Sequence, residues 1–386
     1  MNVKEKDNEY IANTYARFPL VITGGKGSLV TDDAGKTYID LSTGIAVNAF
    51  GVCDDEWTKA VSAQLQKVQH TSNLYYSAPD AALAEMLCKR TGMRKVFFSN
   101  SGAEANECAI KAARKYAAAK KGVEYNTVIT LQNSFHGRTI TTLAATGQEV
   151  FHRDFLPLTA GFDYAEANNI DDLYAKVAKN KTAAILFECV QGEGGVLPLE
   201  SAFVAAIEKI CRENDILMIA DEVQTGNGRT GKLYAYMHYG VTPDIVTTAK
   251  GLAGGLPLGA TLLGEKVKDV FTPGSHGSTF GGNPVACAGA ISILSRIDDD
   301  LLQKVREKSD FIVRSLTGAP GIKRVSGMGL MLGVETEKDA SAVIAECMEN
   351  GVLAIKAKNK VRLLPALNIP DDLLARAVEV IKNACK

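Results

Sequence analysis

The sequence lacks the features that mark several whole classes of protein. No apolar run approaches the ~20 residues that a membrane-spanning helix needs, and the charged segment 1–20 has no apolar core of a signal peptide. No long basic run occurs and the net charge is −1, which gives no reason to expect nucleic acid or an acidic membrane as a partner. We therefore expect a soluble, cytoplasmic protein with no nucleic-acid or membrane partner.

Cysteine and histidine also lack the spacings that are typical of metal sites and redox motifs. The eight cysteines show no C-x-x-C spacing, and the five histidines form no close pair. Scattered thiols are typical of a reduced cytosolic enzyme rather than of a disulfide framework, and no metal site is expected. The length of 386 residues favours two or three domains, and 46% hydrophobic residues can bury a large core.

The most informative stretch, residues 216–259, contains two apolar runs that each lead to a chemically useful residue. Ile216–Ala220 is followed by Asp221, and Asp244–Thr248 leads to Lys250 and a glycine-rich turn. Short apolar runs bounded by charge are typical of buried parallel strands, and open α/β sheets bind ligands beyond the carboxyl ends of their strands. The pattern therefore predicts an acid and an amine at one edge of a sheet.

This pairing suits pyridoxal phosphate. A lysine amine can hold that cofactor as a Schiff base, and a carboxylate beside the ring nitrogen keeps the nitrogen protonated. The plain alternative is a capping acid and a solvated surface lysine, which are commoner. This stretch alone leaves both interpretations open.

A second stretch could receive a phosphate. The predicted strand Lys95–Phe98 leads into Ser101 and Glu104, which predict a capping box at the start of a helix that continues to Lys121. Gly102 has no Cβ, and the first turn of a helix exposes N–H groups that attract anions. A well-capped helix without any ligand is the alternative.

Two further loops carry suitable side chains. Phe135-His136-Gly137-Arg138 follows the predicted strand Thr127–Leu131, so an aromatic ring could stack on a flat cofactor and an arginine could bind a carboxylate. A surface salt bridge is the alternative for this arginine. Glu188, in a predicted buried strand, places another acid at the sheet edge.

Strands and helices alternate from about residue 95 to residue 264, which predicts an α/β fold with a mostly parallel, doubly wound sheet. The last part of the chain predicts a smaller α+β domain. We expect a segment 1–50 that packs with the small domain, a large domain over 51–285 and the small domain over 286–386. Residues 24–40 predict a hairpin that turns at Asp33-Ala34-Gly35.

In combination, six motifs resemble those of the class III (ornithine-type) pyridoxal-phosphate aminotransferases of fold type I, over essentially the whole chain. The motifs are Ser101–Glu107 (SGAEANE), Phe135–Thr139 (FHGRT), Gln191–Glu193 (QGE), Asp221–Gly226 (DEVQTG), Ala249–Gly251 (AKG) and Gly277–Pro284 (GSTFGGNP). Within the family, the likeness is greatest to the enzymes that act on acetylornithine in arginine biosynthesis.

The resemblance implies a role for each matching residue. Lys250 is implied to bind pyridoxal 5'-phosphate and to move the proton, with Asp221 on the ring nitrogen. The other implied cofactor contacts are Gln224 near the ring's 3-oxygen, Phe135 on the ring face, Gly102 and Ala103 at the phosphate, and Thr279 from the second subunit of a homodimer. The implied substrate contacts are Arg138 on the distal carboxylate, Ser278, and a switchable pair of Glu193 with Arg362.

The implied reaction moves the terminal amine of N2-acetyl-L-ornithine to 2-oxoglutarate. Other donors stay open, namely succinylornithine, N-succinyl-diaminopimelate, ornithine and 4-aminobutyrate, and so does an aminomutase of the same fold. Gly44-Ile45 replaces the bulky aromatic residue of ornithine δ-aminotransferases, and the extra room favours an N-acylated donor. The family commonly has G-H-x-H-P where this chain has Gly51 followed by Val52-Cys53-Asp54-Asp55, which leaves the packing of that segment open.

Overall fold

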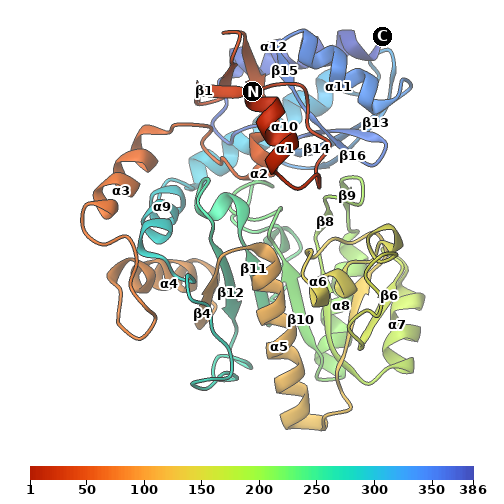
Figure 1. Ribbon diagram of the computed structural model, residues 1–386. Coiled ribbons are helices and arrows are strands. Elements are labelled where there is room, and N and C mark those ends of the chain that lie inside the picture. Colours follow the sequence, from red (N-terminus) through yellow and green to blue (C-terminus); the bar gives the residue numbers. More distant parts are fainter.

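A seven-stranded sheet forms the centre of the larger of two lobes in the computed structural model, which describes residues 1–386 (Figure 1). In spatial order, its strands are β4 (Lys95–Ser99), β12 (Gly259–Leu263), β11 (Ile245–Thr248), β10 (Leu217–Asp221), β7 (Thr182–Phe187), β5 (Thr127–Leu131) and β6 (Phe162–Ala165). β12 runs antiparallel to both of its neighbours, and the other adjacent pairs are parallel. The predicted α/β class with a mostly parallel sheet is confirmed.

Alternate side chains of the central strands face opposite layers of helices. In β10, Leu217 and Ile219 belong to the same apolar cluster as Ala109 and Ile110 of α5 (Gly102–Lys121). Met218 and Ala220 instead join the cluster that contains Phe203 and Ile207 of α8 (Ser201–Glu213). Because both faces are covered, every residue of β10 is buried. The remaining helices of this lobe are α3 (Asp55–Leu65), α4 (Ala78–Thr91), α6 (Ile140–Ala145), α7 (Ile170–Lys179) and α9 (Pro284–Leu294).

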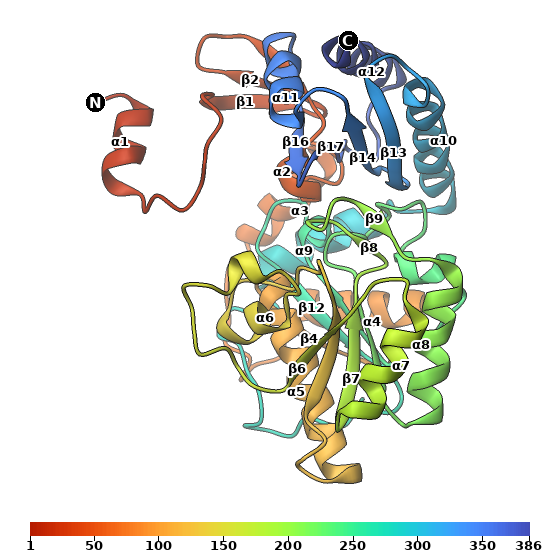
Figure 2. The same cartoon turned by 90° about the vertical axis from the view of Figure 1, so that its right-hand side faces the viewer.

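The smaller lobe combines both ends of the chain (Figure 2). One antiparallel sheet has the order β13 (Ile322–Met328), β14 (Met331–Thr336), β17 (Lys360–Leu363) and β16 (Ile355–Ala357). A second sheet joins β1 (Ile22–Lys26), β2 (Leu29–Asp32) and β3 (Thr37–Asp40) to the late strand β15 (Val352–Leu353). The helices are α10 (Asp299–Leu316), α11 (Ala340–Glu349) and α12 (Asp371–Cys385). The expected hairpin forms between β2 and β3, where the Asp32 carboxylate accepts hydrogen bonds from the N–H groups of Ala34 and Lys36.

The domain division stays a prediction, but the packing of α9 bears on one boundary. This helix packs against α3 and α4 of the larger lobe, although residues after 285 were expected in the small domain. We therefore propose that the chain changes lobes at the connection between α9 and α10. At the other end, α1 (Val3–Tyr10) buries no residue and stands away from both lobes in Figure 2.

An unusual left-handed turn, α2 (Thr43–Ala46), links the two lobes. Its four residues have φ values of 46°, 64°, 65° and 62°, and only one of them is glycine. The Asp40 carboxylate holds the start of the turn by accepting hydrogen bonds from Ser42 N (2.7 Å) and Thr43 N (3.0 Å). Left-handed residues other than glycine cost roughly 1–2 kcal/mol each, so this turn depends on its surroundings. It is followed by Val47, which lines a cavity at the carboxyl ends of the central strands.

The segment that departs from the family pattern starts a helix. The Asp54 carboxylate accepts a hydrogen bond from Trp57 N (2.9 Å), which makes Asp54 the N-cap of α3. The same carboxylate pairs with Arg296 at 2.8 Å. Cys53 precedes the cap with a positive φ of 53°.

Candidate active site

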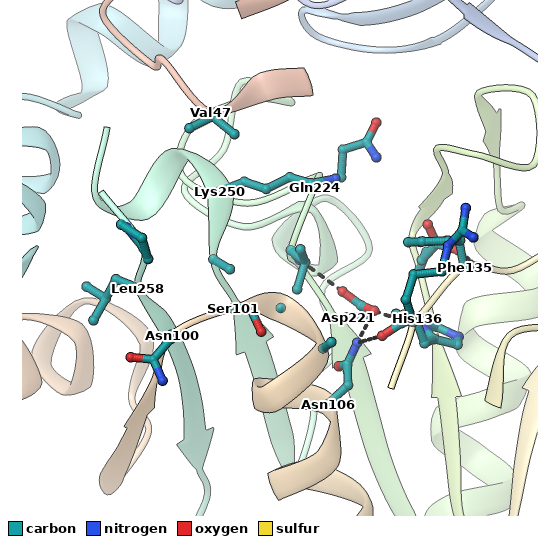
Figure 3. A pocket seen from close by; sticks show the side chains of 18 of the residues that line it. Val47, Asn100, Ser101, Asn106, Phe135, His136, Asp221, Gln224, Lys250 and Leu258 are labelled. Atoms are coloured by element: carbon teal, nitrogen blue, oxygen red, sulfur yellow. Dashed lines mark hydrogen bonds and ion pairs between the residues drawn. The ribbon is translucent and has the colours of Figure 1, made fainter. Parts of the chain in front are cut away.

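A cavity of about 420 Å³ lies beyond the carboxyl ends of the central strands (Figure 3). It is lined by the ends of β10 and β11, by the loop after β5 and by the start of α5. Asp221 and Lys250 both line it, so the structure brings together the acid and the amine that the sequence placed at two strand ends. This is the edge at which open α/β sheets bind ligands.

Three donors fix the Asp221 carboxylate, which is 3% exposed. Its Oδ2 accepts hydrogen bonds from Asn106 Nδ2 (2.8 Å) and from His136 Nδ1 (2.7 Å). Its Oδ1 accepts one from the backbone N–H of Val223 (3.0 Å). With its orientation fixed, this carboxylate presents a stationary negative charge to the cavity.

No contact of Asn106 or His136 with Asp221 was predicted, although both residues lie within the motifs 101–107 and 135–139. Asn106 also accepts a hydrogen bond from the Thr247 hydroxyl (2.7 Å) and is 1% exposed. His136 is 2% exposed, and its Nε2 has no partner. Buried polar side chains normally have a partner that explains them. A polar residue in an alanine-rich, buried helix was the available signal for Asn106.

Lys250 enters the cavity from a strained backbone. It is the second residue after β11 and has a φ of 45°, which is uncommon for a residue other than glycine. Its side chain extends toward Gln224 (Figure 3). Burial lowers the pKa of the Lys250 amine and the charge of Arg362 lowers it further, while Glu193 and Asp221 oppose the shift. A lowered pKa makes the unprotonated amine, which can act as a nucleophile or a base, more available near neutral pH.

The start of α5 closes one side of the cavity. Gly102 and Ala103 line it, and their N–H groups lie in the first turn, where a helix provides no backbone acceptor. A Cβ on Gly102 would come within 2.6 Å of Val223 Cγ1, so glycine is required for this close packing. The predicted capping box is wrong in its second half. Ser101 Oγ accepts from Glu104 N at 3.2 Å, but the Glu104 carboxylate accepts from Asn100 N instead of Ser101 N.

The loop after β5 supplies Phe135 and Arg138 to the cavity wall. The Phe135 N–H donates to Glu188 Oε2 at 3.0 Å, which fixes the backbone beside its ring. The Arg138 guanidinium lies over the ring of Phe151 at 4.2 Å and over that of Phe135 at 5.5 Å. Arg138 is exposed and stacked on aromatic rings, so it can reach a carboxylate without first breaking a salt bridge.

Glu193 and Arg362 form an ion pair next to the cavity, with 2.6 Å between Oε1 and Nη1. The same Nη1 donates to Gln224 Oε1 at 3.1 Å. The Arg362 side chain is only 3% exposed and that of Glu193 is 30% exposed, so the glutamate is the partner with room to move. Burial alone raises the pKa of Glu193, but the charge and hydrogen bond of Arg362 outweigh it and lower the pKa below its ordinary value.

Ser278 and Thr279 are not at this cavity. They line a separate hollow of about 890 Å³ together with residues of the loop 70–77. Ser278 Oγ accepts hydrogen bonds from Asn100 Nδ2 (3.2 Å) and Gly281 N (3.0 Å), while Thr279 is exposed. Neither residue lines the cavity of its own chain that holds Lys250. The contact of Thr279 with the phosphate of a second subunit and the contact of Ser278 with the substrate therefore stay predictions.

The residues at the cavity that holds Asp221 and Lys250 fit a flat, phosphate-bearing pyridine. A fixed carboxylate, an amine with a lowered pKa, a helix start with unpaired N–H groups and an aromatic side chain surround one space. No group of three or more His, Cys, Asp or Glu side chains is arranged to hold a metal ion. None of the helices is both long and apolar enough to cross a membrane.

The neighbouring acid, Glu222, leads to a prediction about pH. Burial raises its pKa from 4.5 to about 7, while hydrogen bonds from Thr225 Oγ1, Ala235 N and Tyr236 N oppose the rise. When the pH lies between these two pKa values, Glu222 keeps its proton in the folded state and releases it in the unfolded state. We therefore expect Glu222 to reduce the free energy of unfolding by roughly 1.4 kcal/mol per unit as the pH rises from about 5 to 7.

Glu222→Gln should remove that pH dependence. As the pH rises from 5 to 7, the difference in free energy of unfolding between variant and wild type should therefore shift in favour of the variant. Urea unfolding at fixed protein concentration measures the difference. The exposed substitution Glu213→Gln is the control and should follow the wild type at every pH. Parallel pH profiles for Glu222→Gln and the wild type would contradict the prediction.

Comparisons with known proteins point to one family. A family profile described as Aminotransferase class-III matches residues 10–385. The chain is 49% identical to an acetylornithine aminotransferase from Haemophilus ducreyi, over 98% of this chain and 97% of the relative. A solved ornithine aminotransferase from Toxoplasma gondii has a TM-score of 0.95 at 32% identity, covering 100% of this chain and 95% of that one. For an N-acetylornithine aminotransferase from Stenotrophomonas maltophilia, the TM-score is 0.86 at 34% identity, with 98% and 97% covered.

Proposed function

The chain belongs to the class III aminotransferases, and we propose that it moves the terminal amine of N2-acetyl-L-ornithine to 2-oxoglutarate. The products are N-acetyl-L-glutamate 5-semialdehyde and L-glutamate, a step of arginine biosynthesis. The observation that carries the proposal is the Glu193–Arg362 pair beside the cavity that holds Lys250 and Asp221. The cofactor is pyridoxal 5'-phosphate.

Bound at this cavity, pyridoxal phosphate supplies a carbonyl that takes up the substrate amine and a cationic ring that stabilises negative charge on the adjacent carbon. Lys250 would hold the cofactor and, as a free amine, would move the proton at that carbon. Asp221 would keep the proton on the ring nitrogen. The Phe135 ring and the first turn of α5 would orient the ring and the phosphate, and Gln224 would contact the ring's 3-oxygen.

One pocket must accept two unlike substrates. Acetylornithine reacts through a terminal amine with no carboxylate beside it, whereas glutamate reacts next to its own α-carboxylate. An arginine near the reacting carbon helps glutamate, but without a partner a buried guanidinium is costly. Glu193 masks Arg362 for the first substrate and moves away for the second, while Arg138 holds the distal carboxylate of both.

We expect Arg362→Ala to impair the glutamate half-reaction far more than the acetylornithine half-reaction. A charge-assisted hydrogen bond is worth ~1.5–3 kcal/mol, which corresponds to roughly 10- to 150-fold in rate constant. Single-turnover absorbance measurements with each substrate alone separate the two half-reactions. Equal losses in both would show that the pair does not switch.

The choice of donor is tested by a panel. Acetylornithine, succinylornithine, N-succinyl-diaminopimelate, ornithine and 4-aminobutyrate are compared by kcat/KM, with and without 2-oxoglutarate. We expect acetylornithine to give the highest value. The resemblance implies that Gly44 and Ile45 replace a bulky aromatic residue of ornithine δ-aminotransferases, and smaller side chains would leave room for an acyl group. A higher value for another donor would reassign the substrate, and turnover without 2-oxoglutarate would indicate an aminomutase.

A homodimer with sites at the subunit interface completes the proposal. The hollow that contains Ser278 and Thr279 is lined by exposed apolar side chains, including Leu74 (88% exposed) and Tyr75 (71%). Large exposed apolar surfaces mark association sites, and a second subunit would bring Thr279 to the phosphate. Light scattering of the purified protein tests the dimer.

All eight cysteines are free, which supports a reducing, cytoplasmic location.

A further inference from the structure

One buried acid at the cavity has no part in the chemistry described above. Glu188 follows β7, lines the cavity and is 5% exposed. Its Oε2 accepts a hydrogen bond from Phe135 N at 3.0 Å, and its Oε1 accepts one from Gly192 N at 3.2 Å. A single carboxylate thus holds the backbones of two different loops.

Each of these two loops carries one residue with a proposed role at the active site. The loop 133–138 presents Phe135 to the cofactor ring, and the loop 191–195 presents Glu193 to Arg362. A second bond runs from Gln191 Nε2 to the carbonyl of Gln132 (2.8 Å), the residue just before the loop 133–138. The position of a Cβ on Gly192 would be 2.6 Å from the Gln224 side chain, so this loop also rests closely on Gln224.

The position favours a carboxylate despite its cost. Burial raises the pKa of Glu188 to about 7, the charge of Asp221 also raises it, and His136 and the two N–H groups oppose the rise. No lysine or arginine forms an ion pair with Glu188 to offset its burial. Two N–H groups need two acceptors, which a carboxylate provides and an amide does not.

We propose that Glu188 is a positioning residue that clamps the loop 191–195 to the loop 133–138, so that Glu193 can leave Arg362 by side-chain motion alone. The inference rests on the proposed function, because it gives the clamp a task in the exchange of substrates. In the acetylornithine half-reaction the Glu193–Arg362 pair itself anchors the loop 191–195. In the glutamate half-reaction the pair is open, and the loop depends on Glu188 and Gln191.

The clamp is tested with Glu188→Gln, which keeps the size of the side chain but replaces one acceptor by an NH2 group. Hydrogen exchange of the holoenzyme should accelerate at least about tenfold for the amides of Phe135 or Gly192, or for both. The glutamate half-reaction should slow at least about tenfold, and the acetylornithine half-reaction less than about threefold. Glu213→Gln, at an exposed position of α8, is the matched control and should change neither.

Unchanged exchange at both amides would overturn the clamp. If Arg362→Ala shows that the ion pair switches, equal losses of Glu188→Gln in the two half-reactions would overturn it as well. If Glu188→Gln does not fold, Glu188→Asp gives the second test, since it keeps the charge but is too short to reach both N–H groups. It should release one loop and show the same selective loss. Because exchange reports on the loops directly, it tests the clamp even if Arg362→Ala shows that the ion pair does not switch.

Discussion

Lys250→Ala is expected to lose turnover by at least about 10⁴-fold, the upper range for removal of a general base. The variant loses both the amine that holds the cofactor and the group that moves the proton. Absorbance near the edge of the visible range should show that the cofactor is no longer covalently attached, and kcat measures the loss. Lys209→Ala, at an exposed position of α8, is the control and should keep both properties.

Wild-type turnover in Lys250→Ala would exclude this lysine from the chemistry. A smaller loss with the covalent attachment intact would mean that another amine holds the cofactor. The strained backbone at φ 45° also predicts that the position, and not only the charge, matters. Lys250→Arg keeps a positive charge but should be as inactive as the alanine variant, since arginine stays protonated.

Asp221→Asn is expected to slow proton abstraction by several orders of magnitude while the cofactor still binds. The amide has the shape of the carboxylate and can still accept hydrogen bonds from Asn106 and His136, but it has no negative charge to hold the ring nitrogen protonated. Single-turnover rates with a donor deuterated at the reacting carbon measure the step. Titration of the apoprotein with pyridoxal phosphate measures binding separately.

A loss of less than about tenfold, or ~1.4 kcal/mol of barrier, would mean that the ring nitrogen has another partner. Asn106→Ala is an instructive companion, because it removes one of the three donors to Asp221 and leaves the charge in place. It should therefore cost much less than Asp221→Asn. An equal cost would show that orientation, rather than charge, is what Asp221 contributes.

The strand ends could be predicted because their signal is local. Asp221 and Lys250 each follow a short apolar run, and the parallel sheet brings such ends to one edge. The antiparallel direction of β12 could not be predicted, because an apolar run is buried equally well in a parallel and in an antiparallel strand. The network of Asn106, His136 and Asp221 was missed for a related reason. It joins three elements, and a sequence shows which polar residues are present but not which ones meet.

The two loops that Glu188 joins illustrate the same limit. Glu188 was recognised as an acid at the sheet edge, but its partners, Phe135 N and Gly192 N, are backbone groups that every residue has. The second half of the capping box failed because Glu104 had another N–H group, that of Asn100, within reach. The hollow at Ser278 and Thr279 is lined in part by the loop 70–77 and by residues of the segment 276–281, and Asn73 donates to the carbonyl of Ser278 across 205 residues of sequence. No local pattern shows that two such distant segments meet.

The pairing of β3 with β15 limits the order in which parts of the protein can fold during synthesis. Lys36 Nζ donates to the carbonyl of Glu349 at 2.7 Å, across a separation of 313 residues. At ~5–20 residues per second, the early strands wait roughly 15–60 seconds for that partner. During this interval the edge of β3 is open, and the larger lobe between the two strands can fold first. Chains that stop before Val352 therefore retain a permanently unpaired edge, which is a template for aggregation.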